Sequence, residues 1–464
     1  MARPVHISRE NLTAQIQMRG PVSATELAAS LRVNRTTVVR TLADYGRRLV
    51  TFGATRSTRY SLRRPVRNAG DHWPIYRITE TGPAVPWAEL ESLHDRRWRI
   101  LWAESPPVWA DRFSDREGLW NGYPFFLSDM RPQGFIGRAI AGRISHTLQV
   151  PANPQTWSDD DTMVYLQAAG EDLPGSLVIG DDCLRRSLQR ALTPLPEELI
   201  VESNRAERYS ALAELTSRTL PGSSAGGEQP KFLTTLTNDS GTLTPVLVKF
   251  SPPMDQLTGQ RWADLLLCEC IAHEVLAEQG LAVPGARIID AAGRRFLEVP
   301  RFDRTAMGGR RGVVSLEALH NSVIGSGQSN WPAEVQELQT EGLIDPNALN
   351  TTRRLHAFGE LIGNTDMHHG NLAFWLDDAL PFRLAPSYDM LPMLWAPGPL
   401  GEIVARTFAP QPPVPAGREA WLEAAGWAID FWQRAAADPR LSPTFAAFTN
   451  EAAATVQRLR LRMS

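Results

Sequence analysis

The sequence of 464 residues contains almost no lysine, few cysteines and no long apolar run. Of its 48 basic residues, all but Lys231 and Lys249 are arginines. The three cysteines are an odd number without metal-ligand spacing, so neither a disulfide framework nor a cysteine-bound metal is expected. No apolar run reaches the roughly 18 residues that a membrane helix needs, and the first residues carry no apolar signal core. We therefore expect a cytoplasmic chain that contacts no membrane.

The composition indicates a globular protein of two to four domains, because the chain is 43% hydrophobic and 21% charged. Its net charge of −3 hides a strong asymmetry. Residues 1–67 hold 13 arginines and three acidic residues, a net charge of +10, so the rest of the chain carries −13. A basic segment on an acidic protein favours nucleic acid as a partner.

The basic segment has the pattern of a winged helix-turn-helix. A helix is predicted over 7–19, and Ser23 and Glu26 are spaced as a capping box at the start of a second one. Asn34 can cap a third helix after a three-residue turn, and residues 49–62 read as a β-hairpin, or wing. The third helix is expected to turn three apolar side chains inward: Val38, Val39 and Leu42.

In a helix-turn-helix the start of the second helix of the motif enters the major groove of DNA. Side chains at that place, which would reach bases or phosphates, are Arg35, Thr36, Thr37 and Arg40. On the wing, Arg56 and Arg59 would hold phosphates. A homodimer would place two such modules on paired half-sites of an operator. The alternative is a helical module that docks a partner and whose arginines are only solvated.

Residues 68–200 read as a globular α+β region with strands near 76–79 and 98–103 and a helix within 129–141. Its tryptophans are expected in the core. The two lysines follow in one apparent sheet, Lys231 after a glycine- and serine-rich loop and Lys249 in the strand over 242–251. Such a loop lets backbone N–H groups approach phosphates, and a lysine supplies a compact positive charge. Glu269, on a helix predicted over 261–281, could pair with Lys249.

A second group of functional side chains follows about a hundred residues later. Asp366 and Asn371 stand on a loop after a helix, and Asp389 follows a short predicted strand. Carboxylate and amide oxygens suit Mg²⁺, and kinases use one Asp as the base and an Asn with a further Asp as metal ligands. His368 and His369 could instead suggest a transition-metal site, but no companion ligand set accompanies them.

Taken in order, these segments resemble one family. The stretches "SSAGGEQPKF", "LVKF", "VPRFDR", "LIGNTDMHHGNLAF" and "LAPSYDMLP" resemble the HipA-like serine/threonine kinases of bacterial toxin–antitoxin systems, over about residues 95–440. The fused basic N-terminus looks like the stand-alone YjjJ-like (HipH-like) branch, whereas typical HipA kinases rely on a separate DNA-binding antitoxin. The chain departs from the family at Pro230, in the phosphate loop, and at Pro300, where glutamate is common.

The resemblance implies an α+β, two-lobed protein-kinase-like fold that uses ATP and Mg²⁺. Asp366 would be the catalytic base, Asn371 and Asp389 the metal ligands, and Lys249 with Glu269 the phosphate-binding pair. The nucleotide would also meet the loop residues Ser223, Ser224, Ala225, Gly226, Gly227 and Lys231. Ser223 or Ser224 falls where the family carries an autophosphorylated serine. Known substrates of the family include aminoacyl-tRNA synthetases, so a translation factor is the expected kind of protein substrate.

The implied domains are a winged helix-turn-helix at 1–67, a linker with an α+β subdomain at 68–200, a kinase N-lobe-like region at 201–305 and a helical catalytic lobe at 306–464. Two other functions stay open at this point. The chain could be a transcriptional regulator whose kinase-like domain senses a ligand, or a small-molecule phosphotransferase of the aminoglycoside or choline type. The leading hypothesis is a HipA-type toxin kinase that regulates its own synthesis through DNA binding.

Overall fold

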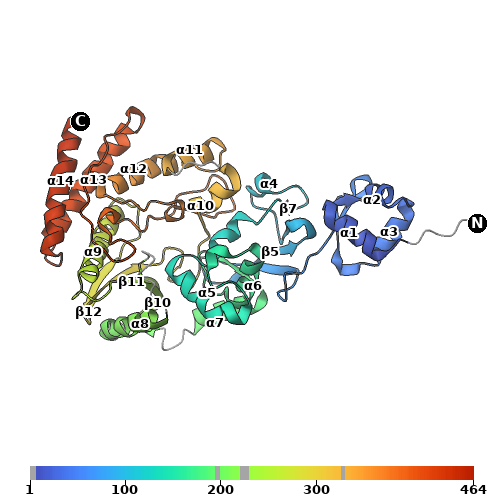
Figure 1. Cartoon of the computed structure of the whole chain (residues 1–464), viewed down its shortest axis with the longest axis horizontal. Helices are drawn as coiled ribbons and strands as arrows, with labels where there is room; N and C mark the ends of the chain where they lie inside the picture. Colours follow the sequence, from blue (N-terminus) through green and yellow to red (C-terminus); the bar gives the residue numbers. More distant parts are fainter. Residues whose placement is uncertain (1–6, 194–198, 220–228, 326–329, 464) are drawn as a thin grey trace, which may run out of the picture.

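The computed structural model of the protein describes residues 7–193, 199–219, 229–325 and 330–463. A small N-terminal module lies at one end of an elongated molecule, and a helical lobe with the C-terminus lies at the other (Figure 1). A mixed α/β region and a sheet-containing lobe lie between them.

The N-terminal module folds in the order predicted for residues 7–62. Its helices and strands are α1 (Arg9–Arg19), β1 (Val22–Ser23), α2 (Ala24–Leu31), α3 (Arg35–Ala43), β2 (Leu49–Phe52) and β3 (Arg59–Leu62), with short 3-10 turns η1 (Gly46–Arg48) and η2 (Thr55–Ser57). The three strands form an antiparallel sheet in the order β1-β3-β2. The predicted capping box starts α2, where the Ser23 and Glu26 side chains each accept the other's backbone N–H.

One detail of this module was predicted wrongly. Val38 and Leu42 are buried, but Val39 is 37% exposed. Successive residues of a helix are about 100° apart around its axis. Val39 therefore points away from the narrow buried stripe that contains Val38 and Leu42. Asn34 precedes α3 without a side-chain cap hydrogen bond.

The wing of the module is packed against the next domain. Val50 and Phe52 of β2 form a small buried cluster with Leu93 and Leu119 of the middle domain. Phe52 is fully buried, and the guanidinium of Arg99 lies over its ring. The N-terminal module is therefore held on the middle domain by an apolar contact.

The middle domain is a five-stranded antiparallel sheet in the order β7-β6-β5-β4-β8 with helices around it. Its strands are β4 (His72–Ile78), β5 (Ala84–Ser92), β6 (Trp98–Trp102), β7 (Leu119–Trp120) and β8 (Leu177–Ile179). Its helices are α4 (Ala110–Phe113), α5 (Gly134–Leu148), α6 (Asp159–Ala169) and α7 (Asp181–Leu192), with 3-10 turns η3 (His94–Arg96), η4 (Phe125–Met130) and η5 (Pro154–Thr156). The tryptophans lie in or against its core, as expected.

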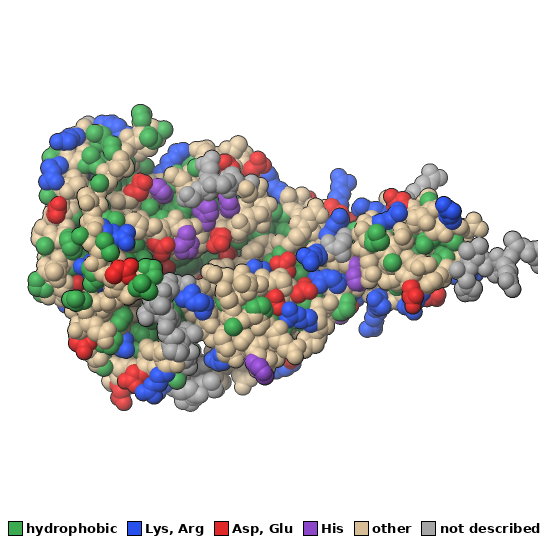
Figure 2. All heavy atoms as spheres, viewed as in Figure 1, with side chains coloured by type: hydrophobic (Ala, Val, Ile, Leu, Met, Phe, Trp, Pro, Cys, Tyr) green, Lys and Arg blue, Asp and Glu red, His purple; other side chains and the backbone are tan. Residues whose placement is uncertain are grey.

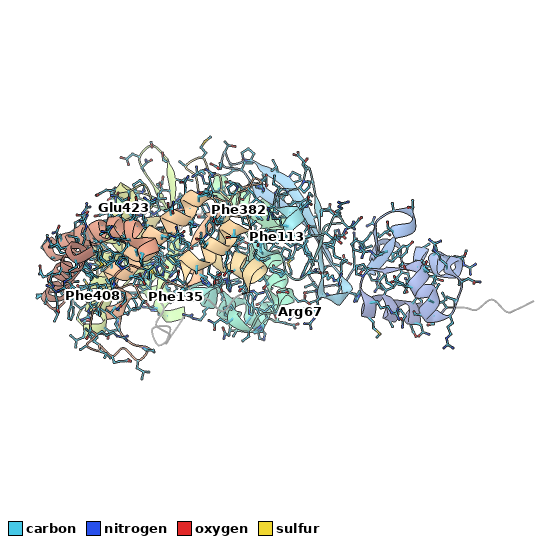
Figure 3. All side chains as sticks on the ribbon, turned by 90° about the horizontal axis from the view of Figure 1, so that it is seen from above. Arg67, Phe113, Phe135, Phe382, Phe408 and Glu423 are labelled. Atoms are coloured by element: carbon cyan, nitrogen blue, oxygen red, sulfur yellow. The ribbon has the colours of Figure 1, made fainter. Side chains whose placement is uncertain are left out.

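A tryptophan also joins this domain to the helical lobe. Phe113 of the middle domain and Phe382 of the helical lobe, both labelled in Figure 3, pack against the ring of Trp109. The Trp109 indole N–H donates to the Asp377 carbonyl at 2.9 Å. The two regions share one continuous apolar core.

The sheet-containing lobe has five strands in the order β12-β13-β11-β10-β9. They are β9 (Leu199–Ile200), β10 (Lys231–Thr237), β11 (Leu243–Phe250), β12 (Arg287–Ala291) and β13 (Arg294–Pro300), with helices α8 (Arg205–Thr219) and α9 (Leu257–Glu278) and the turn η6 (Glu202–Asn204). One face packs on Tyr209 of α8 through Phe232, Phe250 and Phe296. Alternation along a strand sends the neighbouring residues to the other face, where Leu297 meets α9.

The helical lobe contains α10 (Leu316–Leu319), α11 (Trp331–Thr340), α12 (Pro346–Ile362), α13 (Arg418–Ala437) and α14 (Pro443–Met463), the strands β14 (Val313–Ser315) and β15 (Ala373–Trp375), a π-helical turn η8 (His320–Ile324) and the 3-10 turns η9 (His369–Asn371), η10 (Met393–Trp395) and η11 (Pro415–Gly417). The strand predicted just before Asp389 is reduced to two isolated bridges, one between Ile344 and Phe382 and one between Phe374 and Leu384.

Two compositional expectations can be compared with the structure. Cys183, Cys268 and Cys270 are buried and unbridged. Within the described part of the chain, no helix combines the length and the apolar character that a membrane crossing requires.

Candidate active site

The two lysines lie directly opposite each other. Lys231 begins β10, and its Cα pairs with that of Lys249 in the antiparallel ladder of β10 and β11. Opposite residues of such a pair project from the same face. This face is the one that α9 covers, because Phe232 and Phe250 point to the other side. The sequence identified both residues, and the strand register brings them together.

Lys249 is buried between two carboxylates from distant segments. Its Nζ donates to Glu269 Oε1 of α9 at 2.6 Å, and it also forms a short contact with Asp389 Oδ1. The Lys249 side chain is 4% exposed. The predicted pairing with Glu269 is thus present, and Asp389 joins it as a second partner.

The electrostatics of this triad follow from burial and proximity. Burial alone would lower the pKa of Lys249, but the carboxylates of Asp389 and Glu269 outweigh it and raise that pKa. Burial also opposes ionisation of Asp389, yet the ammonium groups of Lys249 and Lys231 hold its pKa well below the ordinary value. For Glu269, burial wins over Lys249 and raises the pKa. Asp389 is therefore the firmly anionic member of the set.

The backbone at Asp389 is unusual. Its φ is +56°, in the left-handed region that residues with a Cβ rarely adopt. Backbone strain of this kind persists where the surrounding structure holds it, and it is concentrated at functional sites. Here the contact with Lys249 holds the side chain.

The loop that carries Asp366 begins at Gly363, which ends α12 with a φ of +75°. A Cβ at this position would stand 2.9 Å from the Trp395 ring, so glycine is required on both grounds. Within the loop, Asn371 Nδ2 donates to the Asp366 carbonyl at 2.8 Å. The D-x-x-x-x-N spacing is thus a closed turn in which the amide of Asn371 fixes the backbone of Asp366.

Asn364 is a functional candidate that the sequence analysis missed. It is 4% exposed; its Oδ1 accepts the Asp366 N–H at 3.0 Å, and its Nδ2 donates to the Asp389 carbonyl at 3.3 Å. One buried amide therefore joins the segments of Asp366 and Asp389. The only signal in the sequence was its place between Gly363 and Asp366, which does not reveal a long-range partner.

The Asp366 side chain is exposed to solvent. Partial loss of hydration still raises its pKa; His368 opposes this effect, and the Asp389 carboxylate adds to it. The ammonium groups of Lys231 and Lys249 lower this pKa, so Asp366 lies within electrostatic range of both lysines and of Asp389. On the face shown in Figure 2, acidic and histidine side chains gather near the middle of the molecule.

The two adjacent histidines make different contacts. The rings of His369 and His320 are 4.8 Å apart, and His320 Nδ1 lies 2.7 Å from Glu334 Oε2. His368 instead accepts the Gly370 N–H in its own turn. In the described ranges, no group of three His, Cys, Asp or Glu side chains is placed to hold a metal ion.

Asp389 and Asn371 offer oxygen atoms of the kind that bind magnesium. Asn371 uses its Nδ2 in the loop, which leaves its Oδ1 as an oxygen ligand. Asp389 is held anionic, and its contact with Lys249 is made through Oδ1. Mg²⁺ is commonly held by one or two protein oxygens together with substrate phosphates and water. The donor set fits that mode, although not a metal cage built by protein side chains alone.

Beyond the triad, an aromatic pair borders the same region. The rings of Phe302 and Tyr388 are stacked with centroids 5.7 Å apart, and the Tyr388 hydroxyl donates to the Gly370 carbonyl at 2.7 Å. Phe302 follows β13 two residues after Pro300. The predicted loop residues Ser223, Ser224, Ala225, Gly226 and Gly227 lie outside the described residues.

The candidate DNA-contacting residues lie on the N-terminal module. Arg35, Thr36 and Arg40 are exposed on α3, and Thr37 is half-buried. Arg59 lies 3.9 Å from the Asp115 carboxylate of the middle domain, so its charge is partly matched within the protein. Arg56 lies in η2, and the structure describes only its backbone.

Most of this chain is similar to known proteins. Residues 69–188 match the family described as YjjJ-like toxin, middle domain, and residues 223–458 match the HipA-like C-terminal domain. Toxin YjjJ of Escherichia coli (strain K12) is 34% identical over 430 residues, which cover 92% of this chain and 93% of that protein. A chain of the solved Shewanella oneidensis MR-1 complex of HipA, HipB and operator DNA aligns with a TM-score of 0.51 and 13% identity, over 83% of this chain and 97% of that one.

The fold and the match to the HipA-like C-terminal domain thus define a chain with the two-lobed, kinase-like fold of the HipA class. Within that class, the chain belongs to the family of HipA-like toxins, in its YjjJ-like branch.

Proposed function

We propose that this chain is an ATP- and Mg²⁺-dependent serine/threonine protein kinase that restrains growth as a toxin. The observation that carries the proposal is the ionic contact between Lys249 and Asp389, beside Glu269 and within electrostatic range of Asp366. Kinases use a lysine, a glutamate, a base and a metal-binding aspartate in these relative roles.

In the proposed reaction, the hydroxyl of a protein serine or threonine attacks the γ-phosphorus of ATP. The bond from that phosphorus to the bridging oxygen breaks, ADP leaves, and the hydroxyl proton passes to Asp366. The raised pKa of Asp366 suits a proton acceptor. Lys249 and Lys231 offer two positive charges to the phosphates from adjacent strands. When bound, Mg²⁺ would be held by Asp389 and Asn371 and would neutralise charge on the phosphates.

The proposal includes autophosphorylation at Ser223 or Ser224. A phosphoserine brings about two negative charges, which would repel the nucleotide's phosphates and switch the kinase off. The protein substrate is proposed to be a translation factor such as an aminoacyl-tRNA synthetase.

A kinase assay tests this function. Incubation with labelled ATP and Mg²⁺ should label the wild type, and Asp366→Asn should abolish labelling while leaving the fold intact, because the site of substitution reaches solvent. Peptide mapping should place the label at Ser223 or Ser224. Failure of the wild-type chain to bind ATP at all would overturn the proposal.

We further propose that the N-terminal module binds operator DNA, so that the toxin regulates its own synthesis. Support comes from the exposed Arg35, Thr36 and Arg40 on α3 and from the net charge of +10 over residues 1–67. A homodimer would engage paired half-sites. Loss of DNA binding in the α3 variants described in the Discussion tests this part separately from phosphoryl transfer.

A further inference from the structure

A pocket of about 490 Å³ lies between the middle domain and the sheet-containing lobe. Its walls come from the ends of α6 and α7, from β10, β11 and their connecting turn, and from the loop after β13. In Figure 1 the α7 and β10 ribbons lie near each other at the lower centre of the molecule. The volume is within the range of about 300–1,000 Å³ that small-molecule sites occupy.

The walls of this pocket are positively charged. Its lining contains four arginines but only two acidic residues, Glu171 and Asp172. The arginines are Arg190, Arg301, Arg304 and Arg310. Hydroxyl groups add further hydrogen-bonding capacity, from Ser187, Thr234, Thr235, Ser240, Thr242 and Thr305. Such a lining favours an anion.

Two of these arginines are already neutralised. Asp172 accepts from Arg301 at 3.0 Å and from Arg304 at 2.7 Å, and Asp303 bonds both of the same guanidinium groups. This network joins the middle domain to the loop after β13. It accounts for the charges of Arg301 and Arg304, and Arg190 lies 3.5 Å from the Glu171 carboxylate. Arg310 is thus the lining arginine that forms no ion pair among the described residues.

Arg310 is 7% exposed and incompletely bonded. Its Nη2 donates to the Glu171 carbonyl at 2.7 Å and to Ser187 Oγ at 3.2 Å. Its Nη1 has no hydrogen-bond partner among the described residues. Burial, with added repulsion from Arg304, lowers the pKa of Arg310 to about 9. A buried guanidinium with an unused donor is costly unless an acceptor arrives.

The pocket is separate from the candidate active site. None of its lining residues belongs to the group of Lys249, Glu269, Asp366, Asn371 and Asp389. The nearest lining residue on β10 is Leu233, two residues from Lys231 and about 7 Å away at the rise of a strand. Because Lys231 itself is not part of the lining, a ligand held at Arg310 does not need the lysine pair.

We propose that this pocket binds a small molecule through a phosphate group, with Arg310 as the principal donor. Both hydrogens of Arg310 Nη2 are used within the protein, so the donor left for a ligand is Nη1. A hydrogen bond from this cation is stronger to an anionic phosphate oxygen than to a neutral acceptor. The ligand would also bridge the middle domain and the loop after β13, which contains Phe302. Because Phe302 stacks on Tyr388, ligand binding would affect the residue that precedes Asp389.

Binding is tested by thermal unfolding of the full chain with millimolar inorganic phosphate or glucose 6-phosphate. Both probes should raise the unfolding temperature of the wild type, because a ligand that binds only the folded state stabilises it. An equal rise at equal concentration assigns recognition to the phosphate alone. A larger rise with the ester shows that the remainder of the ligand also occupies the pocket, and either result supports the proposal.

Arg310→Gln should weaken binding of the better probe at least about tenfold, which is the usual scale for a charge-assisted hydrogen bond. Arg311→Gln is the matched control, because Arg311 is the next residue, is 45% exposed at its side chain and pairs with Glu80 outside the pocket. Thr242→Glu places a carboxylate on an exposed wall residue without disturbing the core, so it tests the pocket even if Arg310→Gln unfolds. It should also weaken binding.

The Lys249→Met variant separates this proposal from the proposed kinase function, because phosphate could otherwise bind at the lysine pair. The rise in unfolding temperature should persist in Lys249→Met. Its loss there, an unchanged rise in Thr242→Glu and Arg310→Gln, or no rise in the wild type with either probe would each overturn the pocket proposal. None of these results would decide the proposed kinase function, which the labelled-ATP assay tests separately.

Discussion

Lys249 and Asp389 are 140 residues apart in the sequence and in direct ionic contact in the structure. The contact closes the sheet-containing lobe onto the loop of the helical lobe that follows β15. Each partner changes the ionisation of the other: the pKa of Lys249 is raised and that of Asp389 is lowered. A nucleotide with its metal would have to share these two charges, so the contact marks where the substrate is expected to enter.

The first prediction concerns why lysine stands at position 249. The Lys249 side chain is 4% exposed and in contact with Glu269 and Asp389. A guanidinium is longer and wider than an ammonium, so we expect it to displace one of these carboxylates. Lys249→Arg should therefore destabilise the protein by about 1–3 kcal/mol through overpacking. Phosphoryl transfer should fall sharply, although the charge is kept. Urea unfolding and the labelled-ATP assay measure the two effects.

Lys231→Arg is the matched control, because Lys231 is half-buried on the neighbouring strand. It should cost less stability than Lys249→Arg. Lys249→Met should cost more, about 3–5 kcal/mol, since it leaves two carboxylates buried without their counter-ion. Wild-type stability and turnover in Lys249→Arg would show that steric fit is not the reason for the lysine.

The second prediction concerns Asn364, which bonds the backbones of both Asp366 and Asp389. Asn364→Ala should lower the free energy of unfolding by about 1–3 kcal/mol, because buried backbone groups lose their partners. It should also lower kcat more than it raises KM for ATP, since the base is misplaced while Lys249 is untouched. Steady-state kinetics at several ATP concentrations separate these terms.

The control for Asn364 is Asn350→Ala, an exposed asparagine earlier on α12. It should leave both kinetic constants and stability near the wild-type values. A drop in stability without any change of kcat in Asn364→Ala would limit Asn364 to a structural role.

Local features of the fold and of the candidate site were predictable from the sequence, whereas most contacts between distant segments were not. The capping box of Ser23 and Glu26 and the D-x-x-x-x-N spacing depend on neighbours within a few residues, and both are formed. The pairing of Glu269 with Lys249 was also predicted, since a strand followed by a helix constrains where the two meet.

The remaining features depend on strand register and domain packing. The opposition of Lys231 and Lys249 is set by how many residues form the turn between β10 and β11. The burial of Phe52 against Leu119 is set by a neighbouring domain, and so is the proximity of Arg59 to Asp115. No local pattern in the sequence encodes such partners.

The third prediction is a pH dependence that arises at Asp129 of η4. Its carboxylate accepts the Ser315 N–H at 2.6 Å and the Ser315 hydroxyl at 2.5 Å, across the boundary between the middle domain and the helical lobe. Burial outweighs these bonds and raises the pKa of Asp129 to about 6, from an ordinary value of 3.8. The folded state therefore binds this proton more tightly than the unfolded state does.

Between pH 4 and pH 6 the folded state holds more protons at Asp129 than the unfolded state, so this group's contribution to stability falls as pH rises through that window. The expected loss is of order 1–3 kcal/mol. Asp129→Asn keeps the shape and an acceptor oxygen but cannot titrate, so its stability should be flatter over this range. Urea unfolding at half-unit pH intervals makes the comparison. Identical slopes for the two proteins would exclude Asp129 as the source.

The last prediction concerns DNA binding by the N-terminal module. Arg35→Ala and Arg40→Ala should each weaken binding to the operator region of the chain's own gene, because each removes an exposed positive charge from α3. Each phosphate contact that is lost should reduce the slope of log K against log salt by about 1. Arg47→Ala is the matched control, since Arg47 is exposed on η1 of the same module but outside the predicted contact helix. Fluorescence anisotropy at several salt concentrations measures affinity and slope together. Binding that does not respond to salt, or that Arg47→Ala weakens as much as Arg35→Ala does, would argue against α3 as the DNA-contacting helix and for a module that docks a protein.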